Sequence, residues 1–433
     1  MALQARAAGR RRPAQARRAL PPIDRELAWV VAVALASRLA VWAVAAFAAL
    51  LAAGSESPGS IGRQNELRFD DPRLTHPFGS GVDLALAPMA RWDAVWYLRI
   101  AGEGYGADPG LKAAFFPLYP LLVRALGIVL GGGPGGRLIA SYAIALFAFV
   151  AAACVVYRLV RERRDRATAR LAIVLLCAFP GSLWFGAPYA ESLFLAAAAA
   201  SLAWALQGRL WLAAAAGGLA AATRPVGVLL VLPLALVWWQ RWRAGSALTW
   251  HALALLLVPA GIAAFAVLLA AGGAPALAFV DVQSAWARQT VGPLAGVWRA
   301  FEAAWLGVRQ LASGSREVVY FGLAAGDPLR IAAMNVMLFA FLLAALGAMA
   351  VSWRRVPVAL WLWALAVLAF ALSVPAVPQP LMSLPRFLGP LFPLAWGVAV
   401  WARERRADAA VVVAAAVVLG AFAALYGSWN WIG

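Results

Sequence analysis

Residues 27–53 read LAWVVAVALASRLAVWAVAAFAALLAA, the first long apolar stretch of the chain. A helix of about 20 apolar residues crosses the roughly 30 Å of hydrocarbon in a bilayer. The stretch is too long for the apolar core of a signal peptide, which spans about 7–15 residues. We therefore expect an uncleaved first span, preceded by a disordered basic tail in the cytoplasm over residues 1–25.

The composition of the whole chain points in the same direction. Hydrophobic residues make up 64% of its 433 residues and charged residues 13%, against about 45–50% and 25% in globular proteins. No water-soluble core absorbs such an excess. We expect an all-α polytopic membrane protein in which residues 26–433 form a single transmembrane domain.

The charge of the chain is gathered in short basic clusters. The net charge is +18, and every lysine or arginine position except Lys112 holds arginine. Loops rich in Lys and Arg stay in the cytoplasm, so these clusters orient the chain. They indicate no nucleic-acid partner, since none carries a base-reading motif. The arginine bias favours a bacterial plasma membrane.

Further apolar segments alternate with these clusters. They lie at about residues 113–131, 137–160, 171–187, 188–206, 210–223, 225–239, 251–272, 329–352, 358–374, 387–401 and 409–427. Two longer and more polar connections, residues 54–112 and 273–328, are expected outside the cytoplasm, with short helices in each. If residues 113–131 do not cross fully, every basic cluster is inside and about 11 transmembrane helices result. Full crossing gives about 12 and puts the basic residues 158–170 outside.

The first connection carries the most informative motif, RWDAVWYLRIAGEGY over residues 91–105. At helical spacing Asp93 and Tyr97 share one face. The apolar stripe of the same helix consists of Trp92, Trp96 and Ile100. We expect an amphipathic helix along the outer interface, with tryptophans at headgroup depth and Asp93 where a lipid head and a second substrate meet. The alternative is that Asp93 only pairs with Arg91 or hydrates the helix.

Breaks in the apolar segments supply further polar candidates. FFP at residues 115–117 and PGSLWFGAPYAES at residues 180–192 force irregular backbone, which a membrane tolerates only where protein or a cavity surrounds it. The second break presents Tyr189 and Glu191. The alternative for Glu191 is helix capping, because it also complements the positive end of the apolar helix that it starts.

Arginines at such breaks are candidates for phosphate binding. Arg224, in TRPVG at residues 223–227, separates apolar pieces that are each too short to cross. An arginine at that depth costs up to about 3 kcal/mol, and its planar guanidinium suits phosphate; snorkelling toward the interface is the structural alternative. Arg386, in SLPRF at residues 383–387, and Arg38 are further candidates.

The second connection contains FVDVQSAWAR over residues 279–288. Its Gln283 amide and Trp286 ring suit sugar recognition, although an interfacial helix has a similar composition. The isolated cysteines and histidines exclude a disulfide framework and a zinc site. No metal or organic cofactor is required. A divalent ion held by oxygen ligands would have to draw on Asp70, Asp71, Asp93 and Glu191.

Taken together, these motifs resemble the GPI mannosyltransferase II (PIG-V) family of membrane glycosyltransferases with the C-type (GT-C) fold. The resemblance covers roughly residues 30–400, in the family's order. It implies a GT-C-like fold with a large first extracytoplasmic loop. It also implies inverting transfer of mannose from polyprenyl-phosphate-mannose to an acceptor hydroxyl outside the cytoplasm. The acceptor stays open among glycans, lipids and proteins.

The resemblance also implies roles for individual residues. The acidic residue of the first motif, Asp93, would be the general base. Arg224 or Arg386 would stabilise the departing lipid phosphate, and Tyr189 and Glu191 would position sugar or acceptor. The full set of expected substrate contacts is Arg91, Trp92, Tyr97, Tyr189, Glu191, Arg224, Gln283, Trp286 and Arg386.

Two other classes of function stay open. A flippase of lipid-linked sugars, or a small-molecule transporter, would show discontinuous helices in two related halves, and no internal repeat is present at half length. A non-catalytic membrane subunit would not need its acidic loop residues.

Overall fold

The computed structural model describes residues 23–55, 60–79, 81–321 and 326–432, and within these ranges every regular element is a helix. The expected all-α class is confirmed. Residues 1–22 of the expected basic tail lie outside the described residues, and the first helix begins at Ile23.

The α-helices are interleaved with short 3-10 helices, labelled η. Up to the middle of the chain they are α1 (Ile23–Ser55), α2 (Ile61–Phe69), α3 (Pro72–Thr75), α4 (Gly81–Leu86), η1 (Ala87–Met89), α5 (Asp93–Glu103), η2 (Gly110–Ala114), α6 (Leu118–Val129), α7 (Pro134–Arg163), α8 (Arg166–Ala178), η3 (Pro180–Gly186), α9 (Glu191–Leu206) and α10 (Leu210–Thr223). There follow η4 (Pro225–Leu230), α11 (Val231–Arg243), η5 (Thr249–Leu256), α12 (Leu257–Ala271), α13 (Ala278–Asp281), η6 (Val282–Trp286), α14 (Pro293–Ser313), α15 (Pro328–Ser352), α16 (Val358–Ser373), α17 (Leu384–Leu388), α18 (Phe392–Arg405) and α19 (Asp408–Gly427).

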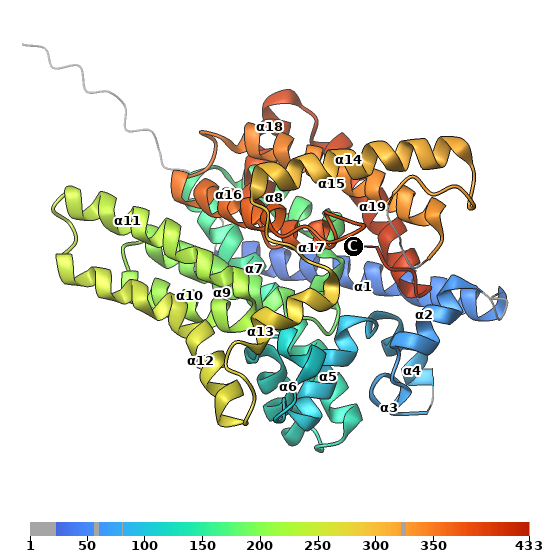
Figure 1. The fold of residues 1–433 in the computed structure, drawn as a ribbon. Coiled ribbons are helices and arrows are strands. Elements are labelled where there is room, and N and C mark those ends of the chain that lie inside the picture. Colours follow the sequence, from blue (N-terminus) through green and yellow to red (C-terminus); the bar gives the residue numbers. More distant parts are fainter. Residues whose placement is uncertain (1–22, 56–59, 80, 322–325, 433) are drawn as a thin grey trace, which may run out of the picture.

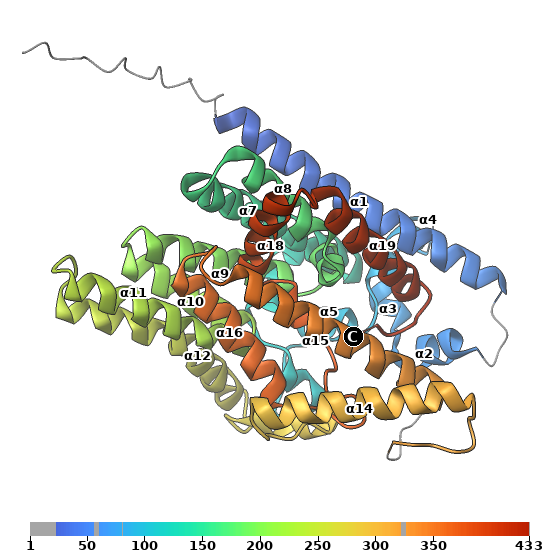
Figure 2. The same ribbon diagram turned by 90° about the horizontal axis from the view of Figure 1, so that it is seen from above.

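The molecule is an elongated helical bundle with α10 and α11 toward one end and α2, α3 and α4 toward the other (Figure 1). The long helix α1 runs along one edge beside α19, and α14 lies across α15 and α16 (Figure 2). Short helices lie in both polar connections, as expected: α2 to α5 in the first, and α13 and η6 in the second. The second connection also contains α14, a longer helix of 21 residues.

Length and composition identify the membrane-spanning helices. Over the described ranges, six stretches are long and apolar enough to cross a membrane, or seven if α8 and η3, bent by 79°, form one span. The apolar helices α6, α9, α10 and α16 are shorter. A multi-pass membrane protein is thus confirmed, whereas the expected count of about 11 spans stays a prediction.

Helix α6 bears on the segment that was expected not to cross fully. It has 12 residues, which makes it about 18 Å long, well short of the roughly 30 Å of hydrocarbon.

Helix α1 presents large apolar side chains on its outer surface, with Leu39 61% and Phe47 63% exposed. Such a surface is stable against lipid and not against water.

Three of the basic clusters, around Arg164, Arg355 and Arg405, meet at the end of the bundle where α1 begins. Glu26, near the start of α1, lies 2.9 Å from Arg166 at the start of α8. Arg164 donates to the carbonyl of Arg355 at 2.7 Å, and Arg355 pairs with Glu404 at 2.6 Å. The charge rule places such clusters on a single side of the membrane, and their convergence agrees with it.

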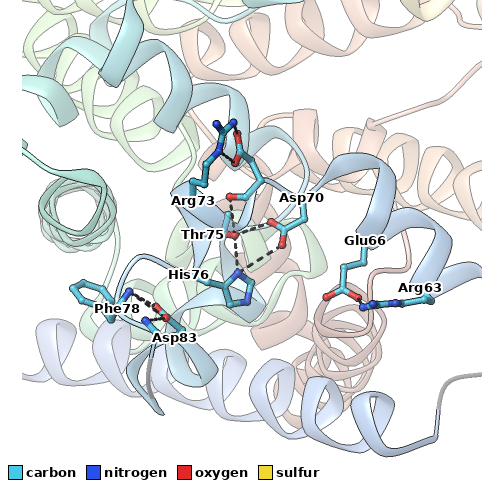
Figure 3. Close-up of polar contacts among 10 residues, drawn as sticks. Arg63, Glu66, Asp70, Arg73, Thr75, His76, Phe78 and Asp83 are labelled. Carbon is cyan, nitrogen blue, oxygen red and sulfur yellow. Dashed lines mark hydrogen bonds and ion pairs between the residues drawn. The ribbon is translucent and has the colours of Figure 1, made fainter. Parts of the chain in front are cut away.

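The first polar connection is held by its own hydrogen bonds (Figure 3). Asp70 accepts from the Thr75 hydroxyl at 2.7 Å and lies 3.6 Å from the His76 ring. Asp71 accepts from Arg73, which lowers the pKa of that carboxyl, and pairs with Arg99 of α5 at 3.0 Å. The ion pair with Arg99 ties this loop to α5.

Glycines allow two of the apolar helices to touch at backbone distance. A Cβ added to Gly261 of α12 would lie 2.1 Å from the carbonyl oxygen of Gly218 in α10. Close backbone approach of this kind stabilises helix pairs in membranes, where no hydrophobic effect drives them together.

Gly261→Ala should therefore destabilise the protein by about 1–3 kcal/mol, the usual cost of overpacking. The measurement is the midpoint of thermal unfolding in one detergent. Gly420→Ala in α19 is the matched control, since a Cβ there meets nothing within 4 Å. Equal midpoints for the two variants would show that α10 and α12 do not pack this closely.

Candidate functional site

A cavity of about 560 Å³ opens between the two polar connections and the helices below them. Its lining includes Asp93, Tyr97, Ala114, Phe115, Phe116, Thr223, Arg224, Phe279, Asp281, Gln283, Ser284, Trp286, Arg288, Gln289, Thr290, Phe370, Ser383, Arg386 and Phe387. Most of the motifs singled out in the sequence thus contribute to one wall or another. Because both connections line the same cavity, they lie at the same end of the molecule.

The turn before α5 aims Asp93 into this cavity. Trp92 has φ +58°, a left-handed conformation that is costly for a residue with a side chain. The Asp93 amide donates to the Tyr189 hydroxyl at 3.1 Å, and that hydroxyl donates to the Arg91 carbonyl at 2.9 Å. Asp93 becomes the first residue of α5, with its side chain 24% exposed.

Tyr97 lies one helical turn after Asp93 and lines the same cavity, as the helical spacing predicted. Burial raises the pKa of its phenol, so the hydroxyl stays protonated at neutral pH and can donate a hydrogen bond. Trp96 stacks on Phe115, with ring centroids 6.0 Å apart. Asp93 and Tyr97 of α5 therefore bring a carboxylate and a phenol to the cavity, and Phe115 adds an aromatic ring to the same lining.

Two arginines and two acidic residues form a buried ion cluster at the base of the cavity. Arg386 donates from Nη1 to Asp93 and from Nε to Glu191. Arg224 donates to the same Glu191 oxygen at 2.9 Å. The Arg386 guanidinium also lies over the Tyr189 ring, 4.8 Å from its centroid. Residues far apart in the chain are thus fixed together by charge in a medium of low dielectric constant.

Glu191 has a different place from the one expected. Its side chain is 0% exposed and lies behind Arg224 and Arg386, outside the cavity lining. It begins α9, so the positive end of that helix also stabilises its charge. From this position Glu191 pairs with both arginines and does not reach the cavity lining.

Arg288 brings a third guanidinium to the cavity lining. Its Nη1 donates to the carbonyl of Val374 at 3.1 Å, and within the described ranges no carboxylate pairs with it. Burial, followed by the positive charges of Arg386 and Arg224, lowers its pKa. The three guanidiniums exceed the carboxylates of Asp93 and Glu191 by one charge, and the exposed Asp281 of the same lining supplies a third carboxylate.

The loop that carries Arg288 is fixed to the end of α16. The Gln289 amide donates to Pro375 at 3.0 Å, and the Val291 amide donates to Ser373 at 2.9 Å. Gln283 and Trp286 of the same loop line the cavity.

Arg91 and Trp92 do not line the cavity. The Trp92 ring packs inside the protein, 5.6 Å from the Trp429 ring and 5.2 Å from the Trp431 ring, and is not part of an exposed stripe. The Arg91 guanidinium lies over Trp429. The left-handed turn at residue 92 is the physical reason, because it directs both side chains away from the Asp93 face. Tyr189, likewise outside the lining, supports this turn.

Arg38, a further expected phosphate ligand, has a structural task. It is 2% exposed and donates to the carbonyl of Cys177 at 2.8 Å and to the Ser182 hydroxyl at 3.1 Å. These groups belong to the bent junction of α8 and η3, where helical hydrogen bonds are missing. A donor from α1 satisfies them inside the membrane, where water cannot.

The acidic residues considered for a divalent ion do not gather. Within the part of the chain that the structure describes, no group of three or more His, Cys, Asp or Glu side chains is arranged to hold a metal. Asp70 and Asp71 are engaged in their own loop, and Asp93 and Glu191 face arginines.

A second, apolar cavity of about 970 Å³ lies on the other side of α17. Side chains of α8, α15, α18 and α19 line it, and almost all of them are aliphatic, aromatic or small. Leu388 and Gly389 close its end near α17, two and three residues after Arg386. A groove of this composition between membrane helices suits a hydrocarbon chain.

Comparison with known proteins agrees with the motifs. Residues 61–241 match the family model described as Mannosyltransferase (PIG-V). Over 135 residues the chain is 30% identical to GPI mannosyltransferase 2 of Drosophila pseudoobscura pseudoobscura. The aligned segment covers 29% of this chain and 29% of that protein. Over 181 residues it is 32% identical to GPI alpha-1,6-mannosyltransferase 2 of Rattus norvegicus. That aligned segment covers 38% of this chain and 35% of that protein.

The chain thus matches about a third of the length of these curated relatives. The resemblance expected from the motifs is confirmed over residues 61–241, which contain Asp93, Glu191 and Arg224. Arg288 and Arg386 lie beyond the matched segment, and the structure alone brings them to the same cavity.

Two solved structures match the chain at low sequence identity. ArnT from Cupriavidus metallidurans bound to undecaprenyl phosphate is 16% identical, with 74% of this chain and 58% of that chain covered and a TM-score of 0.45. The apo oligosaccharyltransferase of Archaeoglobus fulgidus is 17% identical, with 92% and 56% covered and a TM-score of 0.44.

Removing the carboxylate of Glu191 should leave two guanidiniums without their shared partner. Glu191→Ala is expected to lower the free energy of unfolding by about 3–5 kcal/mol, the range for breaking a buried ion pair. Denaturation in detergent measures this loss. Glu404→Ala, which removes an exposed partner of Arg355, is the control and should change stability little; a similar loss in both variants would contradict the buried cluster.

Proposed function

We propose that this protein is an inverting glycosyltransferase that transfers a hexose, with mannose favoured, from a polyprenyl-phosphate sugar to an acceptor hydroxyl. The observation that carries the proposal is the single cavity in which Asp93 faces Arg224, Arg288 and Arg386. In such a cavity the Asp93 carboxylate can accept a proton, and the neighbouring guanidiniums can bind a phosphate. The match of residues 61–241 to a mannosyltransferase family supports the choice of sugar.

The chemistry places the acceptor hydroxyl next to Asp93. Its oxygen attacks the anomeric carbon of the donor sugar from the face opposite to the phosphate, and the Asp93 carboxylate takes the hydroxyl proton. The bond between the anomeric carbon and the phosphate oxygen breaks, and its electron pair leaves with the lipid phosphate. Configuration at the anomeric carbon is inverted because attack and departure occur on opposite faces.

The arginines act on the charge that develops as the phosphate departs. The planar guanidiniums of Arg224, Arg288 and Arg386 can each donate two hydrogen bonds to phosphate oxygens. Fixed donors of this kind stabilise a transition state because they need no reorganisation when charge appears. Glu191 keeps Arg224 and Arg386 in place from behind.

The sugar would lie against the amide and aromatic groups of the second polar connection. Gln283 and Trp286 line the same cavity as Asp93 and Tyr97, so amide donors and an aromatic face are available on one side of the reacting carbon. The apolar groove beyond α17 supports a substrate that carries a lipid chain.

We place the reaction outside the cytoplasm. The cavity is formed by the two polar connections, whereas the basic clusters around Arg164 and Arg355 meet elsewhere, at the end where α1 begins. By the charge rule that basic end is cytoplasmic. The arginine-rich composition favours a bacterial plasma membrane, and the acceptor is a glycan, lipid or protein hydroxyl. Residues 26–433 then act as one transmembrane domain, with the catalytic loop in residues 54–112.

The Asp93→Asn variant tests the role of the base. The amide keeps the size of the side chain but cannot take the acceptor proton, so turnover should fall by about 100- to 10,000-fold. The assay follows labelled sugar from polyprenyl-phosphate-mannose into a cell-envelope extract. Asp108→Asn, an exposed change in the same connection, should retain activity; full turnover by Asp93→Asn would exclude Asp93 as the base.

Arg288→Ala tests the phosphate contact. Loss of a charge-assisted hydrogen bond of about 1.5–3 kcal/mol should raise the KM for the lipid donor roughly 10- to 100-fold, with a smaller effect for Arg288→Lys. Arg309→Ala is the control, since Arg309 is exposed and stacks on Tyr320 away from the cavity. A donor KM unchanged in Arg288→Ala would remove this residue from the phosphate site.

A further inference from the structure

The turn that aims Asp93 is held from outside the cavity by the segment at the end of α19. The Tyr426 hydroxyl lies 3.0 Å from the carbonyl oxygen of Arg91 and 3.1 Å from the hydroxyl of Tyr189. The Tyr189 hydroxyl in turn accepts from the Asp93 amide. Two buried phenols thus contact the backbone on both sides of Trp92, the residue with the left-handed conformation.

Residues 426–432, which we call the clasp, also hold the side chains that precede Asp93. The Trp429 ring lies under the Arg91 guanidinium, 4.6 Å from its centroid, and against the Trp92 ring. Asn65 of α2 donates to the carbonyl of Trp429 at 2.9 Å. The clasp is therefore fixed to the first polar connection as well as to the turn.

The start of the clasp packs against the backbone of α1. A Cβ added to Gly427 would lie 2.2 Å from the carbonyl oxygen of Ala45. Among the described residues, neither α1 nor α19 contributes a side chain to the cavity lining. These two helices nevertheless determine where the Asp93 turn lies, because the clasp connects them to it.

We propose that the clasp is a positioning element of the active site and that Tyr426 is its principal positioning residue. The Tyr426 hydroxyl keeps residues 91–93 in a conformation that they would not hold unaided, and so keeps the Asp93 carboxylate beside Arg386. Tyr426 touches no substrate. This assignment rests on the proposed function only where it invokes catalysis by Asp93; the hold on the turn is independent of it.

The Tyr426→Phe variant tests the assignment, because it removes one hydroxyl and leaves the ring. We expect kcat to fall about tenfold, the equivalent of roughly 1.4 kcal/mol, while the KM for the lipid donor stays the same. Hydrogen exchange should become faster in peptides that contain the Asp93 amide and stay the same in peptides from α9 and α15.

Tyr157→Phe is the matched control. Tyr157 is also buried and also donates from its hydroxyl, to Glu26 at 2.9 Å, but at the opposite, basic end of the bundle. This variant should leave both kcat and exchange around Asp93 unchanged. Trp429→Leu, which removes the ring beneath Arg91, should reproduce the effect of Tyr426→Phe.

The outcomes distinguish a failure of the clasp assignment from a failure of the proposed glycosyltransferase function. Wild-type kcat and wild-type exchange in Tyr426→Phe would overturn the assignment of the clasp. Equal losses in Tyr426→Phe and Tyr157→Phe would also overturn it, because they would reveal a general loss of stability. If the unmodified protein transfers no sugar, the proposed function fails, and hydrogen exchange alone still shows whether the clasp holds the turn.

Discussion

The arrangement of the site depends on Arg386, a buried guanidinium between two carboxylates. An isolated charge in such an environment is unstable, and it is retained only where paired groups surround it. Asp93 and Glu191 supply those pairs from the first residues of α5 and α9. The ion cluster therefore joins the start of α5, which follows the turn at Trp92, to the start of α9, which follows the break after α8. Because Asp93, Glu191, Arg224 and Arg386 are linked by ion pairs, replacing one of them removes a partner of at least one other.

Much of this site could be predicted from the sequence, because its residues occupy breaks in otherwise apolar segments. Polar groups at such breaks need partners, and the partners are the polar groups of other breaks. For this reason the stretches around Asp93, Arg224, Trp286 and Arg386 meet at one cavity, and the helical spacing of Asp93 and Tyr97 gave their common face.

Other features could not be predicted, because they depend on local geometry or on distant parts of the chain. A left-handed residue at Trp92 reverses the direction of two side chains, and no pattern of residue types announces it. Glu191 lies behind the arginines because of where α9 packs. Arg288 stands out only because the fold brings it into the same cavity as Arg224 and Arg386. Tyr426 is a single phenol in an apolar helix, and the sequence does not show which turn it contacts. Each becomes meaningful only when the segments are placed together.

The apolar groove beside α17 has a consequence for how the protein would meet a lipid substrate. Because membrane helices line this groove, the lipid chain of the proposed donor would enter it sideways, from within the bilayer and not from water. The substrate pool is then two-dimensional. The rate of encounter would follow the mole fraction of the lipid in the membrane, so diluting the substrate with other lipids would slow the reaction even when its amount per volume of suspension is constant.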